Sequence, residues 1–157
     1  MAVLAGASRT AHRNRLRTIL EFVKIEHSLF ALPFVLAGLV VGLLAEGRPL
    51  VASVANARLL ALVLVAAVGA RTLAMTLNRV VDREIDALNP RTASRALVTG
   101  EMRLRTAWAL AAASGAALVL AAGALNPLCL ALSPVLVALF FAYPYAKRVT
   151  WLSLIHI

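Results

Sequence analysis

One stretch of this sequence limits the fold more than any other. From Thr106 to Ala146 there is no Asp, Glu, Lys, Arg or His. A helix needs about 20 apolar residues to cross the hydrocarbon core of a bilayer, so this stretch is long enough for two crossings. Near its middle, Asn126 and Pro127 suit a tight turn better than a continuing helix. We therefore expect two membrane helices joined at this turn.

Two further apolar stretches, from Ser28 to Ala45 and from Leu59 to Ala70, extend this pattern to the N-terminal part of the chain. The whole chain is 62% hydrophobic, whereas soluble domains are about 45–50% apolar. Its mean hydropathy is +0.87. The sequence therefore predicts an all-α, polytopic transmembrane bundle with four membrane helices, at about residues 22–45, 57–86, 105–124 and 128–147. Residues 1–21 are expected to form a basic cytoplasmic arm.

The net charge of +9 could suggest a nucleic-acid partner, but the distribution of the basic residues favours a membrane topology instead. Basic residues gather before the first helix, around the loop between the second and third helices, and after the fourth helix. These residues are Arg9, Arg13, Arg15, Arg17 and Lys24; Arg79, Arg83, Arg91, Arg95, Arg103 and Arg105; and Lys147 and Arg148. The positive-inside rule then places the N-terminus, the 87–104 loop and the C-terminus in the cytoplasm. We expect an integral protein of the inner (cytoplasmic) membrane that binds no nucleic acid.

A polar stripe at the end of the second predicted helix is the strongest candidate for a functional site. At 100° per residue, Asn78, Asp82 and Asp86 fall within about 80° of one another, and Arg71 shares their face. Consecutive members of the stripe are one turn apart, so their oxygens can converge on one small cation. Carboxylate oxygens together with water and substrate phosphates are the ligands that Mg²⁺ prefers.

Two free-energy costs argue against a stripe that has no function. Both acids would lie at the C-terminal end of their helix, where the helix dipole disfavours negative charge by about 0.3–1 kcal/mol each. An ionisable residue inside a span costs about 2.5–3.5 kcal/mol, so Arg71 should face a polar cavity. An alternative stays open, in which Arg79 and Arg83 pair with the acids in a salt-bridged rim. Glu84 points about 160° away from Asp82 and is expected at the surface.

The loop after the stripe runs through Asn89, Pro90, Arg91 and Arg95 to Gly100. Arginine binds phosphate oxygens in a bidentate way, so Arg91 and Arg95 could close over an anion bridged to the metal. A basic cytoplasmic loop that serves only topology would look similar, and both interpretations remain open at this point.

The fourth predicted helix ends in Tyr143, Tyr145, Lys147 and Arg148. Aromatic residues at this position are typical of the membrane interface, and a Lys-Arg pair is typical of a topology signal. Since the pair lies on the same side of the membrane as the aspartates, it could also neutralise a bound diphosphate.

Taken together, these segments resemble the UbiA-type membrane prenyltransferases, the family of 4-hydroxybenzoate polyprenyltransferase. The resemblance runs from about Lys24 to Trp151. Its segments are Lys24-Ile-Glu-His-Ser-Leu-Phe-Ala-Leu-Pro33, Arg71 to Asp86 with the Asn78-x₃-Asp82-x₃-Asp86 spacing, Asn89-Pro-Arg91-Thr with Arg95 and Gly100, and Tyr143-Pro-Tyr-Ala-Lys147-Arg148. These separate segments, in the right order, make the match specific.

The resemblance implies a Mg²⁺-dependent transferase whose substrates are a polyprenyl diphosphate and an aromatic acid. By analogy with the family, Asp82 and Asp86 would be catalytic metal ligands, with Asn78 orienting them. Arg148 and Lys147 would stabilise the departing diphosphate, with Tyr143 or Tyr145 lining the site. Arg71, Arg91 and Arg95 complete the expected diphosphate-binding set. Ionisation of the allylic diphosphate would leave a cation for attack by a ring carbon of an acceptor such as 4-hydroxybenzoate, in ubiquinone or menaquinone biosynthesis.

The sequence also departs from the family pattern. Members have eight or nine membrane helices and a second aspartate-rich motif, neither of which these 157 residues contain, and the tail Leu154–Ile157 departs from the pattern too. Residues 22–157 are therefore expected to be the N-terminal half of a prenyltransferase domain that needs a missing C-terminal half. Alone, the chain is expected to bind metal weakly and to catalyse little.

Two functions of other classes stay open: a membrane transporter with an ion path along the stripe, and a non-catalytic helical membrane fragment. A phospholipid head-group transferase of the CDP-alcohol type also uses membrane aspartates. The D-G-x₂-A-R run of that family is absent here.

Overall fold

In a computed structural model of the chain, residues 15–23, 25–54 and 56–149 are described. These residues form seven helices and contain no strand. The helices are α1 (Arg15–Val23), α2 (Ile25–Ala45), α3 (Leu50–Val54), α4 (Ala57–Val81), α5 (Arg83–Leu88), α6 (Leu104–Leu125) and α7 (Pro127–Val149). The expected all-α membrane bundle is confirmed.

Three helices are long and apolar enough to cross a membrane: α4, α6 and the part of α7 from Pro127 to Ala146. Within α2, Ala31–Ala45 forms a shorter apolar helix. Large apolar side chains such as Phe34 on α2 and Leu139 on α7 are exposed on the outer faces of the bundle. Lipid can solvate such surfaces, whereas water would not. The chain is an integral membrane protein.

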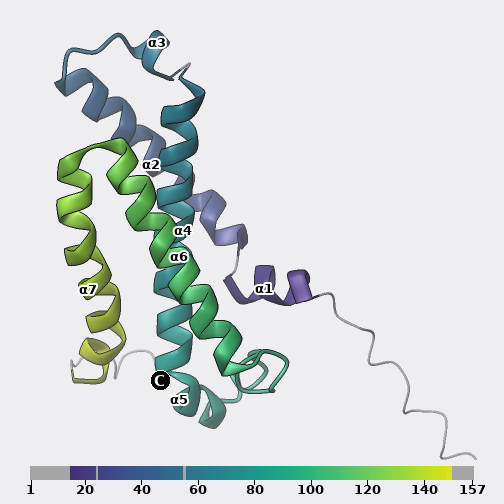
Figure 1. Ribbon diagram of the computed structural model, residues 1–157. Helices are drawn as coiled ribbons and strands as arrows, with labels where there is room; N and C mark the ends of the chain where they lie inside the picture. Colours follow the sequence, from purple (N-terminus) through teal and green to yellow (C-terminus); the bar gives the residue numbers. More distant parts are fainter. Residues whose placement is uncertain (1–14, 24, 55, 150–157) are drawn as a thin grey trace, which may run out of the picture.

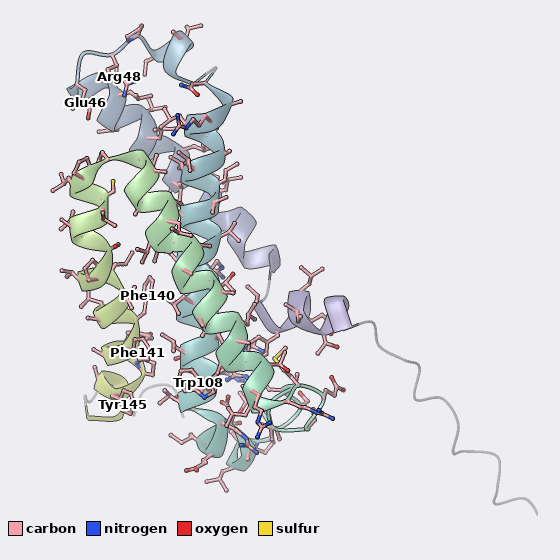
Figure 2. The ribbon with its side chains drawn as sticks, in the orientation of Figure 1. Glu46, Arg48, Trp108, Phe140, Phe141 and Tyr145 are labelled. Carbon is pink, nitrogen blue, oxygen red and sulfur yellow. The ribbon has the colours of Figure 1, made fainter. Side chains whose placement is uncertain are left out.

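The long helices run alongside one another, as Figure 1 shows, with α4 and α6 packed over most of their length and α7 against both. Of these three long helices, α4 is the one that α2 mainly contacts. At one end of the bundle lie α5, the 89–103 segment and the end of α7. Glu46 and Arg48 lie at the opposite end, far from Tyr145 (Figure 2).

Close approach between α4 and α6 depends on a glycine. A Cβ atom at Gly69 would lie 2.9 Å from the backbone oxygen of Ser114 and 3.2 Å from the backbone nitrogen of Leu118. Toward the C-terminal end of α4 from this point, Leu73, Leu77 and Ala111 are buried in the same apolar cluster as Leu118. Small residues at such crossings let backbones meet, which is a common way for membrane helices to associate.

The predicted turn in the longest apolar stretch is confirmed. α6 ends at Leu125 and α7 begins at Pro127, with Asn126 between them. The side-chain oxygen of Asn126 accepts a hydrogen bond of 2.7 Å from the backbone N–H of Cys129. Proline suits the first position of a helix, where its missing N–H costs nothing. Asn126 and Pro127 therefore end one membrane helix and begin the next.

The predicted end of the second helix was wrong, because residues 57–86 do not form one continuous helix. α4 ends at Val81, and Asp82 has φ −82° and ψ 1° before α5 begins at Arg83. These angles depart from the helical ψ of about −42°. One consequence corrects the dipole argument: Asp86 lies in the first turn of α5, where a negative charge is favoured rather than disfavoured.

A second apolar cluster lies where α1 meets the 89–103 segment and the first turns of α6. Phe22 and Val23 from α1 are buried together with Leu97, Met102 and Ala107. Residues 15–21, which were expected to belong to a basic arm, thus include most of a helix whose end packs on the protein. This cluster holds the polar loop in a folded position next to the end of α4.

Candidate active site

The three members of the stripe keep their helical spacing despite the break at Asp82. The backbone N–H of Asp82 donates to the carbonyl of Asn78 at 2.9 Å, and the N–H of Asp86 donates to the carbonyl of Asp82 at 2.8 Å. Asp82 is 8% exposed and Asp86 is 7% exposed. Two carboxylates are therefore buried on consecutive turns, Asp82 directly after α4 and Asp86 within α5.

Arg95 supplies a positive charge to the acidic stripe. Its Nη1 lies 2.5 Å from Oδ2 of Asp86, as an ion pair and a hydrogen bond. The hydroxyl of Thr92 donates to the backbone carbonyl of Asp86 at 2.9 Å. The 89–103 segment thus contacts both the side chain and the main chain of Asp86. Arg95, not Arg79 or Arg83, is the arginine that pairs with this acid.

The local sequence explains why Arg95 reaches Asp86. Asn89 has an extended backbone, φ −100° and ψ 118°, which is the conformation that a following proline imposes. Its side-chain oxygen accepts a hydrogen bond from the backbone N–H of Arg91 at 3.0 Å. The carbonyl of Arg95 accepts hydrogen bonds from the N–H groups of Val98 at 2.8 Å and Thr99 at 2.9 Å. The loop is thus a series of hydrogen-bonded turns.

Arg79 is a residue whose environment the sequence did not reveal. It is 6% exposed, and its guanidinium carbon lies 4.9 Å from the centre of the Phe22 ring. Such stacking is a favourable contact between a cation and an aromatic face. The sequence pattern indicated Arg79 only as a topology-setting basic residue or as part of a salt-bridged rim with the acids, because its partner ring comes from a distant segment, α1.

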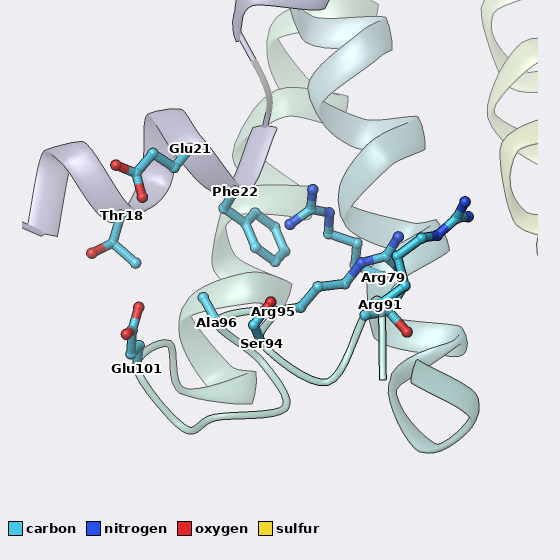
Figure 3. Close-up of a pocket in the computed structure, with 10 residues that line it drawn as sticks. Thr18, Glu21, Phe22, Arg79, Arg91, Ser94, Arg95, Ala96 and Glu101 are labelled. Atoms are coloured by element: carbon cyan, nitrogen blue, oxygen red, sulfur yellow. The ribbon is translucent and has the colours of Figure 1, made fainter. Parts of the chain in front are cut away.

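A cavity of about 520 Å³ lies between α1 and the 89–103 segment (Figure 3). Its lining includes Arg79, Arg91 and Arg95, whereas Asp82 and Asp86 do not line it. Thr18 and Glu21 from α1 and Glu101 from the loop form part of the wall. Both loop arginines are therefore brought to one cavity, and Arg95 also reaches an acid of the stripe.

Arg71 is not brought to the acids. It precedes Asp82 by 11 residues, which is about 16 Å along a helix. Its Nε atom is buried and has no hydrogen-bond partner among the described residues, and the same is true of the hydroxyl of Thr76. Arg71 does not line the cavity between α1 and the loop, so its expected exposure to a polar cavity is not seen there.

The end of α7 holds the remaining predicted residues. Tyr143 and Tyr145 are exposed, and Tyr145 lies at the same end of the bundle as α5 (Figures 1 and 2). The helix backbone continues through Lys147 and Arg148, but their side chains lie outside the described residues. Their expected part in diphosphate binding therefore stays a prediction.

Glu84 is exposed on α5, as expected for a surface residue. Among the side chains that the structure describes, no three His, Cys, Asp or Glu are grouped so that they could hold a metal ion. The candidate cation ligands near the end of α4 are therefore Asp82, Asp86 and the side-chain amide of Asn78.

Comparison with known proteins shows one family model and one solved structure that are similar to this chain. Residues 29–156 match the family described as the UbiA prenyltransferase family. The fold is similar to a solved structure described as the apo structure of a UbiA homolog from Aeropyrum pernix K1, with a TM-score of 0.67 and 42% sequence identity. That match covers 80% of this chain and 42% of the solved chain. Among curated proteins, no match to the chain was found.

Proposed function

Because the chain belongs to the UbiA prenyltransferase family, we propose that the whole protein transfers a polyprenyl group from a polyprenyl diphosphate to an aromatic acceptor. The chain spans 42% of the length of the solved homologue. We propose accordingly that residues 22–157 are the N-terminal half of the catalytic domain and supply half of its site. The observation that supports this most directly is the pair of buried carboxylates, Asp82 and Asp86, on consecutive turns beside Arg95.

The donor set at the end of α4 fits Mg²⁺. This ion is usually bound by one or two carboxylates together with waters and substrate phosphates, and not by a closed protein cage. Asp82 and Asp86 would hold it, and Asn78, one turn before Asp82, would orient the first carboxylate. When bound, Mg²⁺ would supply positive charge where the diphosphate oxygens gather negative charge.

The basic residues of the chain would stabilise the diphosphate as it leaves. As the bond between the allylic carbon and the diphosphate oxygen breaks, its electron pair leaves with the diphosphate. Fixed cationic groups stabilise that charge best because they need not reorganise during the reaction. The ion pair of Arg95 with Asp86 supports such a role for Arg95, and Arg148, Lys147 and Tyr143 at the end of α7 would complete it. Arg71 and Arg91 are assigned to the diphosphate by the sequence motif alone.

The acceptor would be an electron-rich aromatic acid such as 4-hydroxybenzoate or a naphthoquinone precursor, in ubiquinone or menaquinone biosynthesis. A ring carbon would attack the allylic cation and then lose its proton. The basic residues near α5 and in the 89–103 segment favour a cytoplasmic position for this end of the bundle in the inner membrane.

The direct test measures transfer of a radiolabelled polyprenyl group to 4-hydroxybenzoate by the protein extended with the coding sequence that follows residue 157. We expect Asp82→Asn to lower the rate more than 100-fold and EDTA to abolish it, because the charge on the leaving group would lose its counterion. Glu84→Gln removes the same charge from an exposed position two residues away and should change the rate less than about twofold.

Normal transfer by Asp82→Asn would refute the metal assignment. Equal losses in Asp82→Asn and Glu84→Gln would show that only the net charge of this region matters. The isolated 157-residue chain should show little transfer under the same conditions.

A further inference from the structure

The ion pair of Arg95 engages one of the two carboxylates to which the proposed function assigns a metal ion. Nη1 of Arg95 lies 2.5 Å from Oδ2 of Asp86. We propose that Arg95 and a divalent cation exclude each other at Asp86, so that the arginine leaves the carboxylate when the cation binds. This inference rests on the proposed function, in which Asp82 and Asp86 are metal ligands.

Charge is the first reason for this exclusion. Asp86 carries one negative charge, which Arg95 already neutralises. A divalent cation on the same carboxylate would come close to the guanidinium, and like charges at short distance repel each other. Asp86 is 7% exposed, so water and salt screen this repulsion only in part. Holding both cations at Asp86 is therefore unfavourable.

The surroundings of Arg95 allow its side chain to leave without unfolding the loop. The side chain is 31% exposed and lines the cavity of about 520 Å³ (Figure 3), so the guanidinium can turn into water. On either side of Arg95 the loop has contacts that use no carboxylate oxygen. The hydroxyl of Thr92 donates to the main-chain carbonyl of Asp86 at 2.9 Å, and Leu97 is buried in the apolar cluster with Phe22. One side chain can therefore move while the loop stays folded.

The exchange would couple the metal ion to the diphosphate of the proposed reaction. Binding of the metal alone would cost the ion pair between Arg95 and Asp86. The freed guanidinium would regain an anionic partner when the diphosphate binds, which offsets that cost. Each of the two ligands would then raise the affinity of the site for the other.

The opposite arrangement predicts the opposite result. If Arg95 stayed on Oδ2 and oriented Asp86 while the other oxygen held the cation, it would support a metal ligand. Loss of such a supporting partner typically weakens metal binding about 10–100-fold. If the two cations exclude each other, loss of Arg95 strengthens metal binding. The sign of the change in affinity therefore separates the two arrangements.

The test uses Mn²⁺, which prefers the same oxygen ligands as Mg²⁺. The ion is titrated into the purified 157-residue chain in a neutral detergent, and free Mn²⁺ is measured by electron paramagnetic resonance. We expect Arg95→Gln to lower the dissociation constant about three- to tenfold, because the cation no longer has to displace an ion pair.

Two control variants separate this effect from others. Arg83→Gln removes the same charge from an exposed position of α5 but keeps the ion pair, and it should lower the dissociation constant less than about twofold. Thr92→Val removes the other contact between the loop and Asp86 without freeing a carboxylate oxygen. This variant should not strengthen Mn²⁺ binding.

A second measurement follows the side chain in the unchanged protein. With ¹⁵N-labelled arginine, the guanidinium NMR signals of Arg95 are identified by their loss in Arg95→Gln. Saturating Mg²⁺ should speed the exchange of these N–H groups with water several-fold, because they lose their acceptor. In Asp86→Asn the exchange should be fast already and should not respond to Mg²⁺.

Weaker Mn²⁺ binding by Arg95→Gln would overturn the inference, as would equal strengthening by Arg83→Gln or Thr92→Val. Arg95 signals that do not respond to saturating Mg²⁺ would also overturn it. Absence of Mn²⁺ binding would overturn it together with the metal assignment. None of these results depends on transfer to 4-hydroxybenzoate, so the exclusion can fail while transfer is retained, and it can hold where the extended protein shows no transfer.

Discussion

Arg95 and Asp86 form an ion pair, with Nη1 of the arginine 2.5 Å from Oδ2 of the aspartate. The pair joins the 89–103 segment to α5, and through α5 to the end of the membrane helix α4. The Asp86 side chain is 10% exposed and that of Arg95 is 31% exposed, so water screens this pair only in part. The contact therefore contributes to the folded structure of the loop as well as to the charge at the candidate site.

We expect Arg95→Gln to lower the free energy of unfolding by about 1–2 kcal/mol. Removing one partner of a largely buried pair leaves the other charge uncompensated, and partial exposure reduces the full cost of several kcal/mol. Unfolding in mixed detergent and SDS micelles measures the change. Arg83→Gln, at an exposed position of α5, should have almost no effect.

The double variant Asp86→Asn with Arg95→Gln separates pairing from other losses. If the two residues stabilise the fold through their contact, the double variant should be less destabilised than the sum of the single variants. Strict additivity would contradict the pairing.

Phe22 anchors α1, because its side chain is 1% exposed and lies beneath Arg79. We expect Phe22→Ala to cost about 3–5 kcal/mol locally, since the apolar contacts and the cation–aromatic contact are lost together. Limited proteolysis should then cut α1 much faster than in the unchanged protein. Leu20→Ala, at an exposed position of the same helix, should leave the cleavage rate nearly unchanged. Equal cleavage of both variants would argue against docking of α1 through Phe22.

Gly69 should tolerate no side chain. A Cβ there would lie 2.9 Å from the backbone oxygen of Ser114, and a backbone atom cannot move away without shifting α6. We expect Gly69→Ala to cost about 1–3 kcal/mol, as overpacking usually does. Gly42→Ala is the control, because a Cβ at Gly42 would meet nothing within 4 Å. Thermal denaturation in detergent should distinguish the two, and equal melting temperatures would refute the close crossing.

Asn126 caps α7 through its hydrogen bond from the N–H of Cys129. We expect Asn126→Ala to lower the free energy of unfolding by about 1 kcal/mol, which is typical for the loss of such a cap. Asn126→Ser keeps an accepting oxygen and should retain most of the stability. An alanine variant as stable as the serine variant would show that the turn does not depend on this side chain.

Much of the membrane architecture followed from short-range features of the sequence. The uncharged stretch from Thr106 to Ala146 and the Asn126–Pro127 turn predicted α6 and α7 to within a few residues, because lipid requires long apolar helices and proline suits the start of one. The four-residue spacing of Asn78, Asp82 and Asp86 likewise places them on consecutive turns wherever the chain is helical.

Only the tertiary structure decided how this polar end is arranged. The break at Asp82, the pairing of Asp86 with Arg95, and the stacking of Arg79 on Phe22 each involve a backbone or a partner that periodicity does not report. The two side-chain contacts join segments separated along the chain, and they form because the apolar cluster of Phe22, Val23, Leu97 and Met102 holds α1 against the loop. The stripe could thus be read from its spacing, whereas its counter-charge and the neighbouring cavity depend on which segments pack together.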